Sequence, residues 1–288
     1  MPELPEVETI ARGVNERLRG DCIVQAWFGG HREPFKTSPA LQAKGLEGRS
    51  IVSVRRIGKH IVCELGAVDG GRVARGRRGT AKGVEPEAQW IVHLGMTGRL
   101  LVTTPDGPVA PHTHARLRLT SGRELRFVDP RRFGRLEFRD LRKSAGFIGP
   151  GAEPLDIDAE EFARLFRGRK LAIKAALLNQ TLLAGVGNIY ADESLFRAGI
   201  RPRRRAGRLT RVELERLRLA IREVLQHAIQ LGGSSVSDYV DADGVRGFFQ
   251  LEHCVYLRTG LACRLCQTPI QRILLAGRGT HFCPHCQR

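Results

Sequence analysis

The sequence lacks the features that mark membrane and secreted proteins. No apolar run in its 288 residues is long enough to span a bilayer, and no secretory signal peptide opens the chain. Its seven cysteines do not form a disulfide framework in a chain of this size. These absences predict a soluble cytoplasmic protein with no membrane partner.

Acidic residues are scarce relative to basic ones. The chain has 30 Asp and Glu residues against 47 Lys and Arg residues, which gives a formal net charge of +17. Most of the excess is arginine, which suits forked contacts with phosphate. A nucleic acid is the simplest partner, and an anionic membrane surface is the competing interpretation. The Gly- and Arg-rich loop 69–89 either adds non-specific DNA affinity or is a solvated insertion.

The first eight residues read Met-Pro-Glu-Leu-Pro-Glu-Val-Glu. Removal of the initiator methionine, which is usual before a small residue, would leave Pro2 with a free secondary amine. An α-amino group titrates at roughly 7.7–8.0, and amines that attack sugar carbons form Schiff bases. Glu3 stands beside that amine and could transfer a proton. The alternative is an acidic helix start whose carboxylates face the positive end of the helix dipole.

Apolar periodicity divides the chain into a strand-rich part and a helix-rich part. A helix is predicted at 7–18, and short segments rich in Val, Ile and Leu follow it. Many short strands separated by Gly, Pro, Asp and Ser turns favour a β-sandwich or barrel. The segments lie at 22–28, 51–57, 60–65, 90–94, 100–103, 115–120, 124–128 and 135–138.

After a Gly- and Pro-containing linker at 147–154, the apolar period becomes helical. Thr210 and Glu213 form a capping box for a long helix. Glycines precede Asn188, and we expect them to free that helix N-terminus for the approach of a phosphate. The shorter predicted helices lie at 158–166, 171–179 and 188–198.

Several side chains stand in turns from which they could reach a nucleic acid. Lys59 lies between two predicted strands, where it is either an acid/base group, a phosphate ligand or simply solvated. Met96 and Phe133 lie in turns that contain glycine and arginine. Exposed apolar tips of this kind suit a wedge inserted into DNA, and packing beneath a turn is the alternative. His112 and His114 are either phosphate ligands, surface histidines or a catalytic zinc pair, although the last lacks a nearby third ligand.

Four cysteines near the C-terminal end form two CxxC pairs separated by sixteen residues. Four thiolates at this spacing match a tetrahedral structural zinc site, with no open position for catalysis. The segments 270–275 and 280–282 predict a hairpin between the pairs, with Arg278 at its glycine-flanked tip. The predicted ligands are Cys263, Cys266, Cys283 and Cys286.

Six motifs occur in one order along the chain. They are Pro2–Glu8, Gly58–His60, His93–Met96, Asp129–Gly134, Gly185–Ala191 and, in the zinc hairpin, Gly277–Thr280. Together they resemble the bacterial formamidopyrimidine-DNA glycosylase family, whose members remove 8-oxoguanine and ring-opened purines from DNA. The resemblance covers essentially the whole chain, and loop 69–89 looks like an insertion. Leu257 departs from the family, which usually has glycine at that place.

The resemblance implies an α+β fold in two domains, with one structural Zn²⁺. An N-terminal β-sandwich with an N-terminal helix would occupy 1–146, and a helix-two-turns-helix domain 147–252. The four-cysteine zinc β-hairpin would occupy 253–288. The implied partner is double-stranded DNA that contains oxidised purines or abasic sites. A monomer in the bacterial cytoplasm, associated with the nucleoid, is expected.

The resemblance also implies catalytic roles for four residues. Pro2 would attack C1′ of the damaged nucleotide to expel the base and form an imine. Glu3 would act as the general acid that opens the sugar. Lys59 matches the proton donor for β-elimination, and Arg278 matches the residue tied to δ-elimination. One amine would therefore serve both base removal and strand cleavage.

Contacts to DNA are implied in the same way. Met96, Arg131 and Phe133 match the triad that fills the space vacated by the flipped nucleotide, with Arg131 facing the orphaned cytosine. Further DNA contacts match His93, His112, Lys170 and Asn188. The loop whose backbone amides read the oxidised purine matches Val236, Ser237, Asp238 and Tyr239.

Three alternative functions are open at this point. An enzyme of the endonuclease VIII type would act mainly on oxidised pyrimidines, and Leu4 with the Val7-Glu8 ending favours the purine enzyme. A catalytically inactive zinc-hairpin DNA-binding protein is the second alternative, against which Pro2, Glu3 and Lys59 argue. An RNA-binding module would fit the charge and the zinc site, but it gives no reason for a nucleophilic N-terminus.

Overall fold

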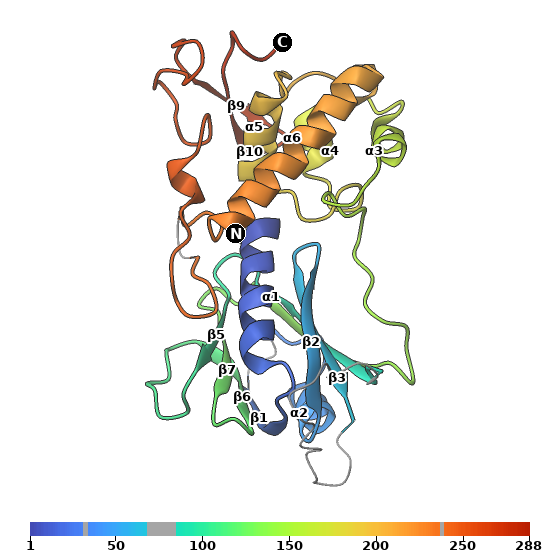
Figure 1. Ribbon diagram of the computed structural model, residues 1–288, viewed down its shortest axis with the longest axis vertical. Helices are drawn as coiled ribbons and strands as arrows, with labels where there is room; N and C mark the ends of the chain where they lie inside the picture. Colours follow the sequence, from blue (N-terminus) through green and yellow to red (C-terminus); the bar gives the residue numbers. More distant parts are fainter. Residues whose placement is uncertain (31–33, 68–84, 237–238) are drawn as a thin grey trace. The chain divides into compact units, whose positions relative to one another are not determined.

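The computed structural model describes residues 1–30, 34–67, 85–236 and 239–288, and these form two compact units (Figure 1). The unit that we call the sheet unit comprises Met1–Pro2, Glu6–Ile148 and Ser235–Gly247. The helical unit comprises Glu3–Pro5, Gly149–Ser234 and Phe248–Arg288. Most of the predicted loop 69–89 lies outside the described residues. The predicted domain boundaries stay predictions.

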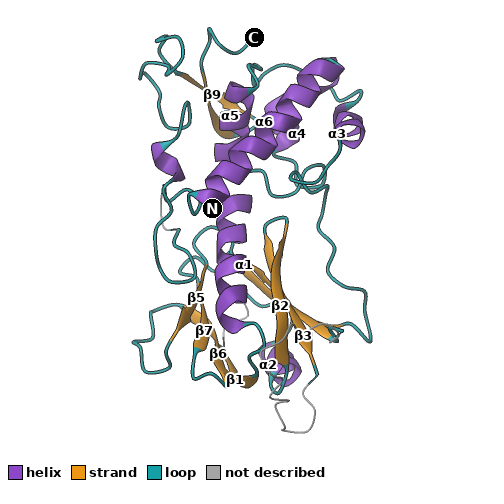
Figure 2. Cartoon of the chain, in the orientation of Figure 1, coloured by secondary structure: helices purple, strands orange, loops and turns teal. Residues whose placement is uncertain are grey.

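The sheet unit contains two four-stranded antiparallel sheets (Figure 2). One has the strand order β1-β6-β7-β5 and the other β2-β3-β4-β8. The strands are β1 (Ile23–Phe28), β2 (Ser50–Ile57), β3 (His60–Gly66), β4 (Ala88–His93), β5 (Arg99–Thr103), β6 (Thr113–Leu119), β7 (Glu124–Val128) and β8 (Arg135–Asp140). Each of the eight predicted strand segments is found, with ends that differ by a few residues.

One core joins both sheets to helix α1 (Leu4–Leu18). Val7, Ile10 and Val14 repeat at helical spacing and are buried in it together with Trp90 of β4. A second helix, α2 (Pro39–Leu46), was not predicted from the sequence. Its Gln42 side chain accepts a hydrogen bond of 3.0 Å from the Trp90 indole. Helix α2 therefore supplies the acceptor that this buried N–H group requires.

The helical unit has its own core, formed by its four α-helices and by Leu4. Thr210 caps helix α6, and the predicted capping box with Glu213 is confirmed. The C-terminal strands β9 and β10 form the predicted antiparallel hairpin. The elements are α3 (Ala159–Phe166), α4 (Ile173–Leu177), α5 (Asn188–Arg197), α6 (Arg211–Gln230), β9 (Gln271–Leu275), β10 (Arg278–Phe282) and the short 3₁₀ turns η1 (Ala206–Arg208) and η2 (Phe249–Leu251).

This arrangement confirms the predicted α+β class with a strand-rich and a helix-rich part. Across the ranges that the structure covers, no helix has the length and apolar character needed to cross a membrane.

Candidate active site and nucleic-acid interface

In the helical unit, Glu3 lies at the N-terminus of helix α5. Its carboxylate is buried and accepts hydrogen bonds from the backbone amides of Ile189 at 3.1 Å and Tyr190 at 3.5 Å. The positive end of the helix dipole stabilises a negative charge at this place. The first helical turn thus holds the general-acid candidate in a fixed orientation, next to Pro2 in the chain.

Gly185 and Gly187 allow the segment that carries Glu3 to lie close to the N-terminus of α5. A Cβ added at Gly187 would lie 2.2 Å from the carboxylate carbon of Glu3. Gly185 has a φ of 96°, and its carbonyl accepts a 3.0 Å hydrogen bond from the Leu4 amide. The expectation that these glycines admit a phosphate to the α5 N-terminus is therefore corrected, because the Glu3 carboxylate uses two of the amides there.

A buried ionic network lies beneath the tip of the zinc hairpin. The ammonium of Lys174 in α4 lies 2.7 Å from the Asp192 carboxylate and donates to the Gly279 carbonyl at 3.0 Å. Asp192 also accepts from the backbone amide of His281 at 2.9 Å. Burial lowers the pKa of Lys174, and Asp192 acts in the opposite direction. The network fixes the backbone next to Arg278, whose side chain stays exposed.

Lys174 was not predicted to have a role, whereas the exposed Lys170 was predicted as a DNA contact. The available signal was a single lysine inside the apolar run Leu171–Leu178. Asn188, which was predicted, does reach the same place, because its side-chain amide donates to the Gly279 carbonyl at 3.1 Å. Asn188 therefore contacts the backbone next to Arg278. No interaction of Lys170 was found among the described residues.

The four predicted zinc ligands converge in the helical unit. Their sulfur atoms all lie within 4.8 Å of one another. The Cys263 and Cys286 sulfurs are 3.9 Å apart, and those of Cys266 and Cys283 are 3.4 Å apart. A tetrahedral zinc with Zn–S bonds of about 2.3 Å requires sulfur separations near 3.8 Å. The donor set therefore fits one structural Zn²⁺.

In the sheet unit, Lys59 lies in the β2–β3 turn and is buried. The adjoining His60 pairs across the strands with His93, with 4.8 Å between ring centroids. Burial and the positive charges of His60 and Lys59 lower the pKa of His93 to about 4. The amide of Gly95 donates to His93 Nδ1 at 3.2 Å, so neutral His93 carries its proton on Nε2 as a donor.

The three predicted wedge residues lie on two adjoining turns. Met96 and Phe133 are 40% and 48% exposed, which excludes packing beneath a turn. The Arg131 guanidinium lies 4.8 Å from the centroid of the Phe133 ring. The turns are in close contact, since a Cβ at Gly95 would lie 2.4 Å from the Phe133 carbonyl carbon. The structure therefore places two apolar tips and one cation at the same edge.

A buried carboxylate holds these turns together. Asp129 accepts from the Thr97 hydroxyl at 2.6 Å and from the Gly134 amide at 2.8 Å. Neither Asp129 nor Thr97 was predicted to have a role. The sequence features that could have indicated them were the Asp-Pro start of one turn and a hydroxyl in the middle of the other.

His112, just before β6, and His114, within β6, have different environments. His112 is exposed, with a φ of 63°, and remains available for a phosphate. His114 is buried, and its Nε2 lies 3.0 Å from the Asp129 carbonyl oxygen. The interpretation of His114 as a surface histidine or a phosphate ligand is therefore wrong.

The segment Ser235–Gly247 packs within the sheet unit. Ala242 is buried, its carbonyl accepts from the Val102 amide at 2.9 Å, and Arg17 of α1 forms an ion pair with Asp243. In the predicted lesion loop, Val236 is exposed and Tyr239 is buried, with its hydroxyl 3.5 Å from the Glu6 carbonyl oxygen. Ser237 and Asp238 lie outside the described residues.

Three family profiles match the chain in sequence order. They are the formamidopyrimidine-DNA glycosylase N-terminal domain at residues 1–136, the formamidopyrimidine-DNA glycosylase H2TH domain at 148–240 and the zinc finger found in FPG and IleRS at 260–288. The formamidopyrimidine-DNA glycosylase of Solibacter usitatus is 45% identical, with 100% of both chains aligned. The chain belongs to the formamidopyrimidine-DNA glycosylase family. The predicted resemblance and the single structural zinc are confirmed.

Solved structures of the same glycosylase family share the fold. Lactococcus lactis Fpg in complex with abasic-site DNA is 34% identical, with a TM-score of 0.84 and 99% of each chain covered. MutM (Fpg) of Thermus thermophilus is 41% identical, with a TM-score of 0.81 and coverage of 99% and 98%. MutM in complex with DNA containing carbocyclic 8-oxo-G is 35% identical, with a TM-score of 0.84 and full coverage of both chains.

Leu257, in the segment that leads into the zinc hairpin, has a φ of 58°. This left-handed conformation favours glycine, because a Cβ approaches the following carbonyl oxygen. Leu257 therefore strains the backbone at this place, while the four cysteine sulfurs still lie within 4.8 Å of one another.

Proposed function

We propose that this protein is a base-excision repair enzyme that removes 8-oxoguanine and formamidopyrimidines from double-stranded DNA and then cleaves the strand. The observation that carries the proposal is the Glu3 carboxylate, which is held on the α5 amides immediately after Pro2. Full-length relatives at 41% and 45% identity, both named formamidopyrimidine-DNA glycosylase, support the substrate class.

Base removal begins at Pro2. Once Met1 is removed, the Pro2 nitrogen attacks C1′ of a nucleotide flipped from the duplex, and the bond from C1′ to the base breaks. Glu3 donates a proton as the sugar ring opens, which leaves an imine between Pro2 and C1′. Its fixed orientation on α5 supports this role, since a placed proton donor typically contributes about 10²–10⁴-fold.

Strand cleavage uses the same imine. The imine makes the neighbouring C2′ protons acidic, so a base can remove one and the 3′ phosphate leaves by β-elimination. Lys59 supplies the proton for that step, and Arg278 assists the δ-elimination of the 5′ phosphate. The burial of Lys59 and the firmly held backbone beside Arg278 support both assignments.

Recognition of the DNA divides between the two units. In the sheet unit, Met96, Arg131 and Phe133 fill the space left by the flipped nucleotide, and Arg131 faces the orphaned cytosine. Phosphate contacts supply most of the affinity, which will therefore fall steeply with salt. The further proposed DNA contacts are His93, His112, Lys170 and Asn188, and the lesion is read by the loop Val236–Tyr239.

The zinc ion, when bound to its four cysteines, cross-links the ends of the hairpin and supplies no reactive group. We expect the protein to act as a monomer. Association with the nucleoid of a bacterial cytoplasm would follow from affinity for DNA.

Borohydride trapping tests the proposed function, because it reduces the imine to a stable covalent adduct. Duplexes carrying 8-oxoguanine or an oxidised pyrimidine would be compared, each opposite cytosine or adenine. An adduct mainly with 8-oxoguanine opposite cytosine is expected. A preference for the pyrimidine lesion would move the assignment to an enzyme of the endonuclease VIII type. No adduct from protein that begins at Pro2 would contradict any enzymatic function.

The variant Pro2→Gly is expected to lose the trapped adduct and strand cleavage, because it removes the secondary amine that forms the imine. Binding to a lesion duplex should survive, since the proposed DNA contacts are unchanged. Gel shift and borohydride trapping on the same preparation measure both properties. Full lyase activity in this variant would remove Pro2 from the mechanism.

A further inference from the structure

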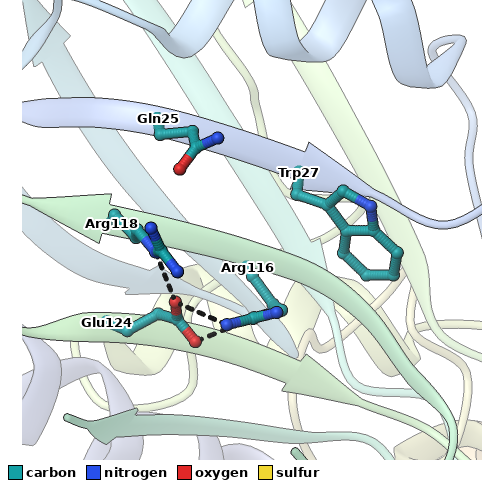
Figure 3. Close-up of a pocket in the computed structure, with 5 residues that line it drawn as sticks. All are labelled: Gln25, Trp27, Arg116, Arg118 and Glu124. Carbon is teal, nitrogen blue, oxygen red and sulfur yellow. Dashed lines mark hydrogen bonds and ion pairs between the residues drawn. The ribbon is translucent and has the colours of Figure 1, made fainter. Parts of the chain in front are cut away.

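The sheet β1-β6-β7-β5 carries a pocket that the proposed repair reaction does not use. Its volume is about 140 Å³, and its lining comes from three adjacent strands. Across these strands, Gln25 pairs with Arg118, and Trp27 pairs with Arg116. The lining residues are Gln25, Trp27, Arg116, Arg118 and Glu124 (Figure 3).

A buried carboxylate organises the pocket from one side. Glu124 accepts from Arg116 Nε at 2.9 Å and from Arg118 Nε at 3.4 Å. It also accepts from Arg126 Nε at 2.5 Å, while the other N–H groups of Arg126 reach backbone carbonyls. Burial raises the pKa of Glu124, but the hydrogen bonds from Arg116 and Arg126 hold it below its ordinary value. Three guanidinium groups against one carboxylate leave a net charge of +2.

The other side of the pocket offers open donors beside apolar surface. Within the described ranges, the terminal amino groups of Arg118 and Nη1 of Arg116 have no acceptor. The side chain of Arg118 is 49% exposed, and Trp27 is 48% exposed. No arginine or lysine of the described chain lies over the Trp27 ring, although Arg116 is its cross-strand partner. Glu124 holds Arg116 away from that ring.

We propose that this pocket docks an acidic segment of a partner protein, in which a carboxylate stands beside a large apolar side chain. The guanidinium edges of Arg116 and Arg118 match the geometry of a carboxylate. The Trp27 ring supplies the surface on which the apolar side chain packs. Tryptophan and arginine are enriched among the residues that dominate binding energy at protein interfaces. The net charge of +17 steers an acidic partner towards the chain.

A nucleic-acid strand fits the same pocket less well. The volume of about 140 Å³ suits a side chain rather than a nucleotide. The Glu124 carboxylate beneath the two arginines uses part of their hydrogen-bonding capacity. A protein carboxylate beside an apolar group satisfies both halves of the pocket.

The test uses the zinc-loaded full-length protein and an oligo-aspartate peptide that ends in phenylalanine. Calorimetry measures its affinity, and tryptophan fluorescence locates it, because Trp27 is exposed whereas Trp90 is buried. We expect Trp27→Ala and Arg118→Glu each to weaken binding at least about tenfold. The matched control, Arg19→Glu, makes the same charge change at an exposed residue outside the pocket and should alter affinity less than about twofold.

A second peptide that ends in alanine separates the two halves of the pocket. It should bind several-fold more weakly to the wild-type protein and show no further loss with Trp27→Ala. The proposal is overturned if the wild-type protein does not bind the phenylalanine peptide, or if binding survives both pocket variants. It is also overturned if these variants weaken binding to an undamaged duplex but not to the peptide, which would assign the pocket to the DNA backbone.

Discussion

Each unit places exposed side chains that we propose to act on DNA above a buried carboxylate, but the two carboxylates have different partners. In the sheet unit, Asp129 lies beneath the turns that carry Met96 and Phe133, and its side chain accepts from a hydroxyl and a backbone amide. In the helical unit, Asp192 lies beneath the hairpin that carries Arg278. Its side chain pairs with a buried ammonium and with the buried ring of a histidine.

The difference predicts how each unit responds to the loss of a partner. Removing a neutral donor leaves one polar group unsatisfied, at a cost of about 1–3 kcal/mol. Removing one member of a buried ion pair leaves an uncompensated charge, at a cost of about 3–5 kcal/mol. Asp192 therefore depends more on its ammonium partner than Asp129 does on its neutral donors.

Zinc removal should have the largest effect of all. Structural zinc contributes a binding free energy of about 10–16 kcal/mol in small zinc domains, which is lost when a chelator removes the ion. We expect DNA binding to be abolished while the circular dichroism of the sheet unit is retained. Fluorescence anisotropy before and after chelation, with metal content measured, checks this, and added zinc should restore binding. Unchanged DNA binding after verified zinc loss would refute the role of the hairpin.

Lys174→Met should have the next largest effect, because it leaves Asp192 buried without its ammonium partner. We expect the free energy of unfolding of the helical unit to fall by about 3–5 kcal/mol. Urea denaturation measures this change. Lys174→Met combined with Asp192→Asn should recover part of the loss, because it also removes the negative charge. A loss below about 1 kcal/mol in the single variant would show that the pair contributes no more than an exposed one.

Asp129→Ala should have a smaller effect on stability. The Gly134 amide and the Thr97 hydroxyl lose their acceptor, so we expect a loss of about 1–3 kcal/mol. Binding to a lesion duplex should weaken as well, because the two turns separate. Asp129→Asn is the matched control, since its amide oxygen keeps one acceptor. A drop in stability as large as that of Lys174→Met would contradict the distinction between neutral and ionic partners.

Removing the ion pair between Arg17 and Asp243 should have the smallest effect. Their side chains are 29% and 41% exposed, and ion pairs of this kind contribute about 0–1 kcal/mol. Asp243→Ala should therefore leave the midpoint of thermal unfolding nearly unchanged. Because the pair anchors the segment that follows the lesion loop, excision of 8-oxoguanine should fall more than cleavage at a preformed abasic site. Equal losses on both substrates would argue against an effect on lesion reading.

Local patterns allowed most elements to be predicted, and the errors have physical causes. Helix α2 was missed although Ser38 caps it and Pro39 begins it, because its apolar residues do not share one face: Leu41 is exposed, whereas Leu46 is buried. The predicted helix 171–179 shortens to Ile173–Leu177, because Ala172 forms an antiparallel bridge with Arg205. Such a pairing between distant segments leaves no trace in the helical period.

Short-range spacing by itself determined the metal ligands and most strands and helices, and the net charge of +17 indicated a polyanionic partner. A CxxC pair or an alternating strand encodes its geometry within a few residues, so it can be read without the fold. Only the tertiary structure decided that Glu3 sits on the α5 amides, that Lys174 supports the hairpin and that Asp129 joins two turns. These contacts join residues up to 186 positions apart, and their energies depend on burial, which arises only when the chain has packed.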